Sequence, residues 1–426
     1  MEDSEVRADH PDSIASQESS HKSNDKKKSR RPANTAFRQQ RLKAWQPILT
    51  PKTVLPLFFT IGIIFAPIGG LLLYASAKVQ EIRLDYTNCY ADAPNNTFAP
   101  MKSSDVSTAF KTSNSSVAAQ WSRSYSNVTY NDVVIPTTKC HLQFHIPENM
   151  GPPVLFYYHL TNFYQNHRRY VNSFYDKQLK GTPVSSADVS GSSCTPLEID
   201  KDTNKPYYPC GLIANSWFND TFTSPLLLST QNSNAFNETY FMKNDSGIAW
   251  GSDKDLYGNL PDETSLDSIM PPPNWRVKYP DGYTKTNPPP SLADNEAFMV
   301  WMRTAGLPSF SKLYQRNDTT SMKEGYYQID IDHYFPSDKY KGTKSIIITT
   351  RTVMGGRNPF LGIAYVVVGG ICILLGAVFT VTHLIKPRKL GDHTYLSWNN
   401  APAGKQPGGP SGAVATGRDL GRPGEA

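Results

Sequence analysis

Two long stretches without Asp, Glu, Lys or Arg constrain this 426-residue chain more than any other feature. They run from Thr53 to Ala77, 25 residues, and from Asn358 to Ile385, 28 residues. About 20 apolar residues cross the hydrocarbon layer of a membrane as a helix, so both stretches predict transmembrane helices. The mean hydropathy of −0.46 argues against a polytopic transporter. The chain is therefore expected to carry one large water-soluble region between two spans.

The charges that flank the two spans predict their orientation. Nine Lys or Arg and no acid lie between Lys26 and Lys52, and Lys386, Arg388 and Lys389 follow the second span. Basic segments stay on the cytosolic side, so both tails are predicted to be cytosolic, and the first span to be an uncleaved signal-anchor. The predicted order is a disordered tail (1–35), a membrane-proximal basic amphipathic segment (36–52), a span (53–77), an exoplasmic domain (78–357), a span (358–385) and a largely disordered cytosolic tail (386–426).

The distribution of Asn-x-Ser/Thr sequons agrees with this topology. Such sequons accept N-glycans only on the lumenal side of the membrane, and none falls in either tail. All seven lie between the spans and predict a glycosylated domain: Asn95, Asn114, Asn127, Asn219, Asn237, Asn244 and Asn317.

Four of the five cysteines lie in the same region. An even number of cysteines in an oxidising compartment predicts two disulfides, for which four residues allow three pairings. Neighbours in sequence meet more often, which favours Cys89–Cys140 and Cys194–Cys210. The fifth, Cys372, is predicted to be a small packing residue within the second span.

Several short segments of the region between the spans alternate or are rich in β-branched and aromatic residues. Strands are expected within 141–146, 154–164, 324–335 and 343–353, and helical segments within 164–179 and 294–303. In 141–146, Leu142, Phe144 and Ile146 are predicted to share one buried face. The predicted fold is a membrane protein in which two helices flank one large β-rich, antiparallel α+β domain.

Motifs for catalysis or cofactors are missing from the sequence. It has no phosphate loop, nucleophile elbow or zinc-protease motif, and no aspartyl-phosphate motif of a P-type ATPase. His141 and His145 share a strand face as two zinc ligands would, but such histidines are more often exposed polar positions of a half-buried strand. Asp330 and Asp332 are interpreted in the same way. No catalytic, cofactor or metal site is predicted, and the spans carry no charge that would serve transport.

Two features leave alternatives open. The segment 36–49 mixes Phe37, Leu42 and Trp45 with basic residues and predicts a short interfacial helix, either a membrane-edge anchor or a docking peptide. In the spans, Ala66 and Gly70 are four residues apart, as are Cys372 and Gly376. Small residues at this spacing let helices approach closely, so the spans are expected to pack either on each other or on a partner's helices.

Six longer motifs resemble those of the β-subunits of type-IV P-type ATPases, the lipid flippases of the ligand-effect-modulator and cell-division-control family. They occur in the family's order over residues 36–387. The motifs are AFRQQRLKAWQPILTP (36–51), NFYQNHRRY (162–170), PCGLIAN (209–215), FMVWMRTAGLP (298–308), GTKS (342–345) and TTRTVMGGRNPFLG (349–362).

This resemblance implies a non-catalytic subunit that binds a ten-span ATPase, supports its exit from the endoplasmic reticulum and supports ATP-driven transfer of phospholipid to the cytosolic leaflet. The expected home is the endoplasmic reticulum, Golgi, endosome or plasma membrane, with no cofactor and no nucleic acid. The alternative is a subunit of a two-span ligand-gated cation channel, whose ectodomain is usually richer in cysteine. The candidate partner-interface residues are Phe37, Arg38, Arg41, Trp45, Arg168, Arg169, Trp301, Arg303, Arg351, Gly355, Gly356 and Arg357.

Overall fold

The computed structural model describes residues 34–42, 50–111, 119–228 and 237–387. Residues 55–387 form one compact unit. Two helices in the described residues, α1 (Pro51–Ala77) and α9 (Pro359–Ile385), are long and apolar enough to cross a membrane. Their bounds lie within two residues of those expected from the uncharged stretches.

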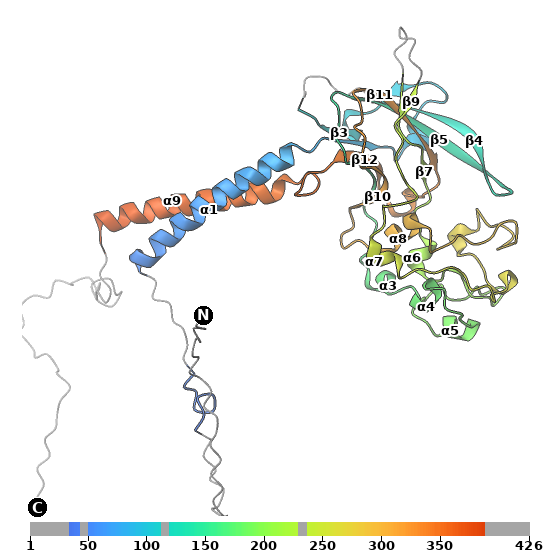
Figure 1. Ribbon diagram of the computed structural model, residues 1–426, viewed down its shortest axis with the longest axis horizontal. Helices are drawn as coiled ribbons and strands as arrows, with labels where there is room; N and C mark the ends of the chain where they lie inside the picture. The colour runs from blue at the N-terminus through green and yellow to red at the C-terminus, as the bar shows by residue number, and fades with distance from the viewer. Residues whose placement is uncertain (1–33, 43–49, 112–118, 229–236, 388–426) are drawn as a thin grey trace, which may run out of the picture. The chain divides into compact units, whose positions relative to one another are not determined.

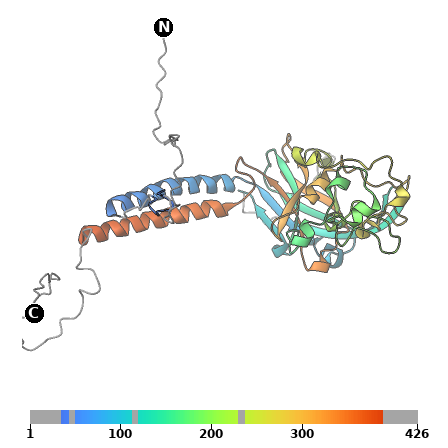
Figure 2. The ribbon, with the colours of Figure 1, turned by 90° about the horizontal axis from the view of Figure 1, so that it is seen from below.

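The two long helices pack against each other along a seam of small residues, and they lie side by side in both ribbon views (Figures 1 and 2). On α1 the buried residues are Gly62, Gly69 and Ser76, and on α9 they are Gly362, Gly369 and Gly376. Each set repeats every seven residues, the spacing that keeps one helix face toward a neighbour.

The seam leaves no room for a side chain. A Cβ atom at Gly69 would lie 2.7 Å from the backbone nitrogen of Val366, and one at Gly369 would lie 2.9 Å from that of Ala66. Of the pair Ala66 and Gly70, only Ala66 lies in this seam, because nothing lies within 4 Å of a Cβ at Gly70. A repeat of seven, rather than four, fixes which glycines face the other helix.

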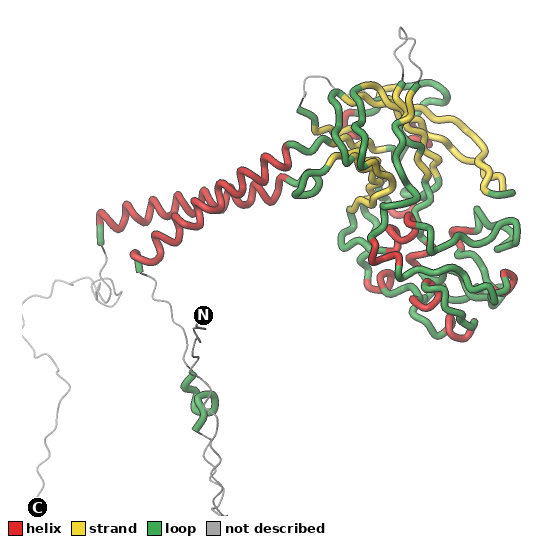
Figure 3. Tube along the Cα trace, viewed as in Figure 1, coloured by secondary structure: helices red, strands yellow, loops and turns green. Residues whose placement is uncertain are grey.

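The region between the long helices is built on two antiparallel sheets, whose strands gather in one half of the domain (Figure 3). The first sheet has the order β10-β6-β12-β1-β3, and the second β2-β4-β5-β11-β8-β9 with β7 also paired to β11. The strands are β1 (Glu81–Asp85), β2 (Ala99–Pro100), β3 (Val106–Ala109), β4 (Gln120–Tyr130), β5 (Val133–Ile146), β6 (Val154–Leu160), β7 (Thr221–Phe222), β8 (Leu226–Leu227), β9 (Glu238–Thr239), β10 (Phe310–Asn317), β11 (Gly325–His333) and β12 (Lys344–Thr350).

The main core lies where the two sheets face each other. Leu142, Phe144 and Ile146 point inward from β5 and are fully buried, as the alternation predicts. Phe156 of β6 meets Phe222 of β7 across the interface, with ring centroids 5.2 Å apart. Sheet and strand positions thus agree with the expected antiparallel fold, although β6 ends at Leu160 and β12 at Thr350, earlier than predicted.

Short helices and loops form the other half of the domain. The helical prediction for 164–179 is correct only for two single turns, α3 and α4, whereas 294–303 contains α8. The short helices are α2 (Cys89–Asp92), α3 (Arg168–Val171), α4 (Asp176–Leu179), α5 (Ser186–Ser190), α6 (Leu212–Asn215), α7 (Gly251–Lys254) and α8 (Glu296–Met302).

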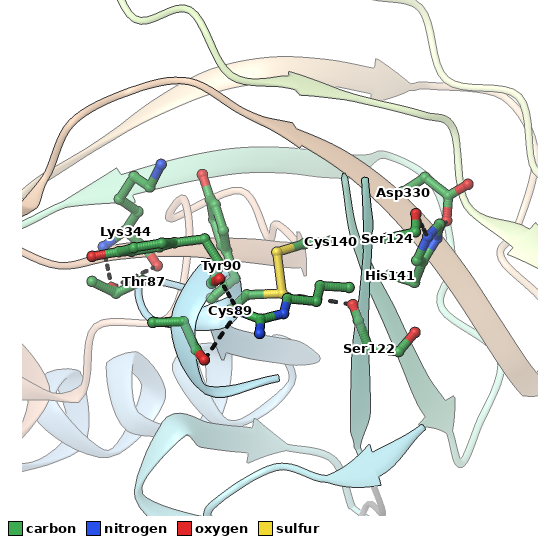
Figure 4. Close-up of a disulfide and its surroundings, with 12 residues drawn as sticks. Thr87, Cys89, Tyr90, Ser122, Ser124, Cys140, His141, Asp330 and Lys344 are labelled. Carbon is green, nitrogen blue, oxygen red and sulfur yellow. Dashed lines mark hydrogen bonds and ion pairs between the residues drawn. A yellow bond between two sulfur atoms is a disulfide. The ribbon is translucent and has the colours of Figure 1, made fainter. Parts of the chain in front are cut away.

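Two disulfides fasten irregular segments to this framework, and they join the pairs that sequence proximity favours. Cys89 of α2 is bonded to Cys140 of β5 (Figure 4). Cys194 is bonded to Cys210, ahead of α6. The loops they close span 51 and 16 residues. Loop entropy assigns them roughly 4 and 3 kcal/mol of stabilisation.

Candidate partner-binding site

Three of the sequence motifs meet in the helical half of the domain. The backbone N–H of Phe163 donates to the carbonyl of Pro308 at 3.1 Å, and that of Ala305 donates to Oε1 of Gln165 at 2.8 Å. The hydroxyl groups of Tyr170 and Ser216 lie 2.7 Å apart. Motif 162–170 is thereby held between motif 298–308 and the end of α6.

Trp301 lies at the centre of this junction and is fully buried. Its indole N–H donates to the carbonyl of Ile213 at 2.8 Å, and its ring packs 5.7 Å from Phe163 and 6.0 Å from Phe335. The prediction that Trp301 contacts a partner was wrong. The reason is that α8 is only seven residues long and its aromatic positions face the core.

The carboxyl end of α8 is capped by a lysine from the neighbouring sheet. Lys312 of β10 donates from Nζ to the carbonyls of Val300, Trp301 and Arg303, at 2.7, 2.8 and 2.6 Å. These carbonyls have no partner within the helix, so the ammonium group satisfies them. Burial, together with the charge of Arg303, lowers the pKa of Lys312 to about 7.

Arg303 follows α8 and is held at the surface. It makes two hydrogen bonds to Asp253 of α7, at 3.1 and 2.9 Å, and its guanidinium lies 4.2 Å from the ring centroid of Trp250. Trp250 itself is 64% exposed. A fixed guanidinium on an exposed indole is an arrangement that interfaces between proteins often use.

Arg168 and Arg169 are exposed on α3, and neither forms an ion pair with a described residue. Two large apolar residues of the adjoining loops are also exposed, Tyr164 by 56% and Leu307 by 69%. We refer to Tyr164, Arg168, Arg169 and Leu307 as the loop surface. Exposed apolar and arginine side chains on loops tied to a rigid core are typical of an interaction surface.

The segment that joins β12 to α9, residues 351–358, forms a tight elbow. Thr352 and Gly355 exchange two backbone hydrogen bonds of 2.9 Å, and Gly355 has a φ of +101°, which only glycine adopts without strain. Val353 and Met354 at the tip are exposed by 104% and 62%. Gly356 has an ordinary backbone and open space around it, so of the two predicted glycines only Gly355 is required by the turn.

Two arginines flank this elbow, and both Arg351 and Arg357 are exposed. Burial raises the pKa of Glu81, at the start of β1, and the charge of Arg357 opposes this rise. The elbow therefore combines an apolar tip with positive charge near the point where α1 gives way to β1.

A buried ion pair that the sequence did not reveal lies between the sheets. The ammonium of Lys344, from motif 342–345, lies 2.7 Å from the carboxylate of Asp220, and both side chains are fully buried. Asp220 also accepts hydrogen bonds from Tyr86, Tyr334 and Phe335, at 2.9, 2.6 and 2.6 Å. Burial alone would raise the pKa of Asp220, but Lys344 and these donors outweigh it and lower the pKa.

The histidine pair considered as a zinc site is engaged in other contacts. His141 lies 2.7 Å from Asp330 through Nδ1 and 2.8 Å from the hydroxyl of Ser124 through Nε2 (Figure 4). His145 instead packs against the ring of Tyr326 at 4.7 Å. Within the described residues no group of three His, Cys, Asp or Glu is placed to hold a metal ion.

The sequons differ in how freely their side-chain amides are presented. Asn114 lies outside the described residues, and Asn95, Asn127, Asn237 and Asn244 are exposed. Asn317 is half-buried, and its Nδ2 donates to the carbonyl of Phe241 at 2.8 Å and to Thr320 at 2.6 Å. A glycan on Asn317 would replace one of these hydrogens.

The membrane-proximal segment is described only from residue 34 to residue 42. Phe37 is 76% exposed and Arg38 and Arg41 are also exposed, while Trp45 lies outside the described residues. The backbone of 36–40 forms turns, and Gln40 has a positive φ of 53°, which interrupts a helix. The predicted interfacial helix is therefore not found in this part of the segment.

Comparison with known proteins identifies relatives that match this chain over most of its length. Residues 72–389 match the family described as the ligand-effect modulator 3 (LEM3) or CDC50 family. The chain is 45% identical over 386 residues to the phospholipid-transporting ATPase accessory subunit CDC50 of Chaetomium thermophilum, which covers 89% of this chain and 93% of that protein. It is 38% identical over 378 residues to the accessory subunit LEM3 of Saccharomyces cerevisiae, covering 87% and 88%. Mouse cell cycle control protein 50A is 39% identical over 367 residues, covering 83% and 89%. The chain therefore belongs to the LEM3/CDC50 family.

Proposed function

We propose that this protein is the non-catalytic accessory subunit of a phospholipid-transporting type-IV P-type ATPase. The observation that carries the proposal is the match to named accessory subunits over nearly nine-tenths of the chain. Two helices that pack on each other, with a large folded domain between them, are consistent with a partner rather than a pump. The cation-channel alternative has no support in these comparisons, and we set it aside.

In this proposal the protein binds the ATPase as a heterodimer and assists its exit from the endoplasmic reticulum. It then supports ATP-driven movement of phospholipid from the exoplasmic to the cytosolic leaflet. Its location follows the ATPase, in the endoplasmic reticulum, Golgi, endosome or plasma membrane.

The deciding experiment is purification of tagged protein in mild detergent, followed by mass spectrometry of what co-purifies. We expect a P-type ATPase in roughly equal amount and phospholipid-stimulated ATP hydrolysis in the complex. The tagged chain alone should hydrolyse no ATP. Recovery of the chain only with itself would contradict the proposal.

The proposed topology places both tails in the cytosol and residues 78–357 on the exoplasmic side. It is supported by the basic flanks of the spans, the sequons and the two disulfides. Treatment of membranes with a peptide:N-glycosidase should increase gel mobility, and protease added to sealed vesicles should remove only the tails. Unchanged mobility would count against this orientation.

We further propose that the partner is bound at three levels. The tail contributes Phe37, Arg38, Arg41 and Trp45, and the elbow contributes Arg351, Gly355 and Arg357. The domain contributes the loop surface together with Arg303. These residues are supported as interface candidates by their exposure in the described part of the chain, with two exceptions. Gly355 is half-buried and is supported by the positive φ that shapes the elbow. Trp45 stays a prediction from sequence.

A further inference from the structure

A cavity of about 650 Å³ opens where the helical half of the domain meets β4 and β5. Its walls come from the segments 215–219, 273–279 and 334–340. They are dominated by aromatic side chains, among them Trp217, Trp275, Tyr279, Phe335 and Tyr340. A concave site of this size that combines aromatic walls with several polar side chains is typical of a small-molecule site.

One wall residue, Asn219, is the acceptor of the sequon Asn219-Asp220-Thr221. Its Oδ1 is buried and has no hydrogen-bond partner, whereas its Nδ2 is neither buried nor bonded. The nitrogen that would carry a glycan is therefore the free end of this side chain. Asn317, whose Nδ2 donates two hydrogen bonds, is the opposite case.

The cavity also lacks partners for some of its polar groups. The hydroxyl of Tyr340 is buried without a hydrogen-bond partner, and the ammonium of Lys278 lies 5.0 Å from the ring centroid of Tyr130. Buried polar atoms nearly always find a partner, so each unpaired one needs an explanation. Sugar hydroxyl and acetamido groups both donate and accept, and the C–H faces of a sugar ring suit aromatic walls.

We propose that the first N-acetylglucosamine residues of a glycan on Asn219 pack into this cavity as a ligand attached to the chain itself. The inference rests on the proposed exoplasmic topology, without which Asn219 meets no glycosylation machinery. A covalently attached sugar has a high effective concentration at its own site, so weak contacts suffice to hold it there. The glycan then fills a space that the chain alone leaves between three loop segments.

The test is a time course of deglycosylation on the native complex, with the occupancy of each sequon followed by glycopeptide mass spectrometry. The probe is a peptide:N-glycosidase, which must reach the bond between Asn and the first sugar. We expect release from Asn219 to be at least about tenfold slower than from the exposed Asn127 and Asn244. After denaturation the three rates should become equal.

A matched pair of variants tests the role of the cavity. Val277 lines the cavity and is 60% exposed, whereas Val134 lies on β5 and is 58% exposed. Val277→Trp should fill the cavity and accelerate release from Asn219 severalfold toward the rate at Asn127. Val134→Trp should leave it unchanged.

Each contrary result points to a different failure. If no sequon carries a glycan, the proposed topology fails. If Asn127 or Asn244 is occupied but Asn219 is not, or if Asn219 is released as fast as they are, the cavity proposal alone is overturned. Slow release that Val277→Trp does not change would also overturn it, since protection would then come from elsewhere.

Discussion

At the scale of single residues, the buried Asp220–Lys344 ion pair connects the two sheets. Lys344 opens β12, and Asp220 precedes β7, so the pair joins the first sheet to the second. Its two side chains are 124 positions apart in sequence. Lys344 also donates to the carbonyl of Phe335, and Asp220 also accepts from Tyr86. The sequence around either residue does not predict the ion pair. Two residues so far apart in sequence meet only because of how the whole domain folds.

Removing one partner of this pair leaves an uncompensated buried charge. We expect Asp220→Ala to lower the free energy of unfolding by about 3–5 kcal/mol, measured by thermal unfolding in detergent. The exposed pair Lys323–Glu238, with both side chains more than 60% exposed, is the control. Glu238→Ala should cost less than about 1 kcal/mol. An equal loss of unfolding free energy in the two variants would contradict the view that the buried pair matters more than the exposed one.

Lys312 makes stability depend on pH in a defined direction. Its pKa of about 7 in the folded chain lies below the ordinary value of about 10.4 in an unfolded chain. Between these values the unfolded state binds more protons, so stability rises with pH by about 1 kcal/mol per unit from pH 7 upward. Lys312→Met should remove this part of the slope while lowering stability, because three carbonyls lose their donor. If the stability of Lys312→Met depended on pH as steeply as that of the unchanged chain, Lys312 would not be the group responsible.

At the scale of elements, the glycine seam between α1 and α9 is open to a test with internal controls. Gly69→Val and Gly369→Val place a side chain against backbone atoms 2.7–2.9 Å away and should separate the helices. Gly70→Val and Gly370→Val meet nothing within 4 Å and should be tolerated by the pair. Disulfide cross-linking of cysteines placed on the two helices measures the separation. Similar cross-linking in all four variants would disprove the seam.

The elbow offers a second matched comparison. Gly355→Val forces a β-branched residue into a φ of +101°, whereas Gly356→Val meets no such strain. We expect Gly355→Val to reduce recovery of the ATPase partner severalfold and Gly356→Val to leave it nearly normal. The measurement is the molar ratio in the purified complex. Equal molar ratios in the two variants would show that the backbone conformation at Gly355 does not matter for binding the ATPase.

Elements with a strong local pattern were predictable from sequence, and those defined by their neighbours were not. The spans could be predicted from their length and lack of charge. Leu142, Phe144 and Ile146 could be predicted to be buried because they alternate with other residues along one strand. Trp301 gave the opposite result. A tryptophan in a short motif has the same sequence whether its helix faces a partner or the core, and only the packing of Phe163 and Phe335 around it decides.

At the scale of the whole molecule, the loop surface is predicted to affect binding without affecting folding. Arg168→Glu combined with Arg169→Glu reverses two exposed charges that pair with no described residue. We expect recovery of the ATPase to fall about tenfold or more, with thermal unfolding unchanged. The charge-matched control is the double variant Lys201→Glu and Lys285→Glu, which reverses the charge of two other exposed residues. Loss of stability along with binding would mean that the arginines serve the fold.

The ladder between β1 and β12 has a mechanical consequence. Glu81 pairs with Thr349, so the domain begins and ends on neighbouring antiparallel strands, next to the ends of α1 and α9. A force that pulled the two helices apart would peel this ladder one hydrogen bond at a time, which is the weak direction for a strand pair. The glycine seam prevents such a load by keeping the helices together. We therefore expect a partner that tilts one helix to move both, so that β1 and β12 are loaded together and are not pulled apart.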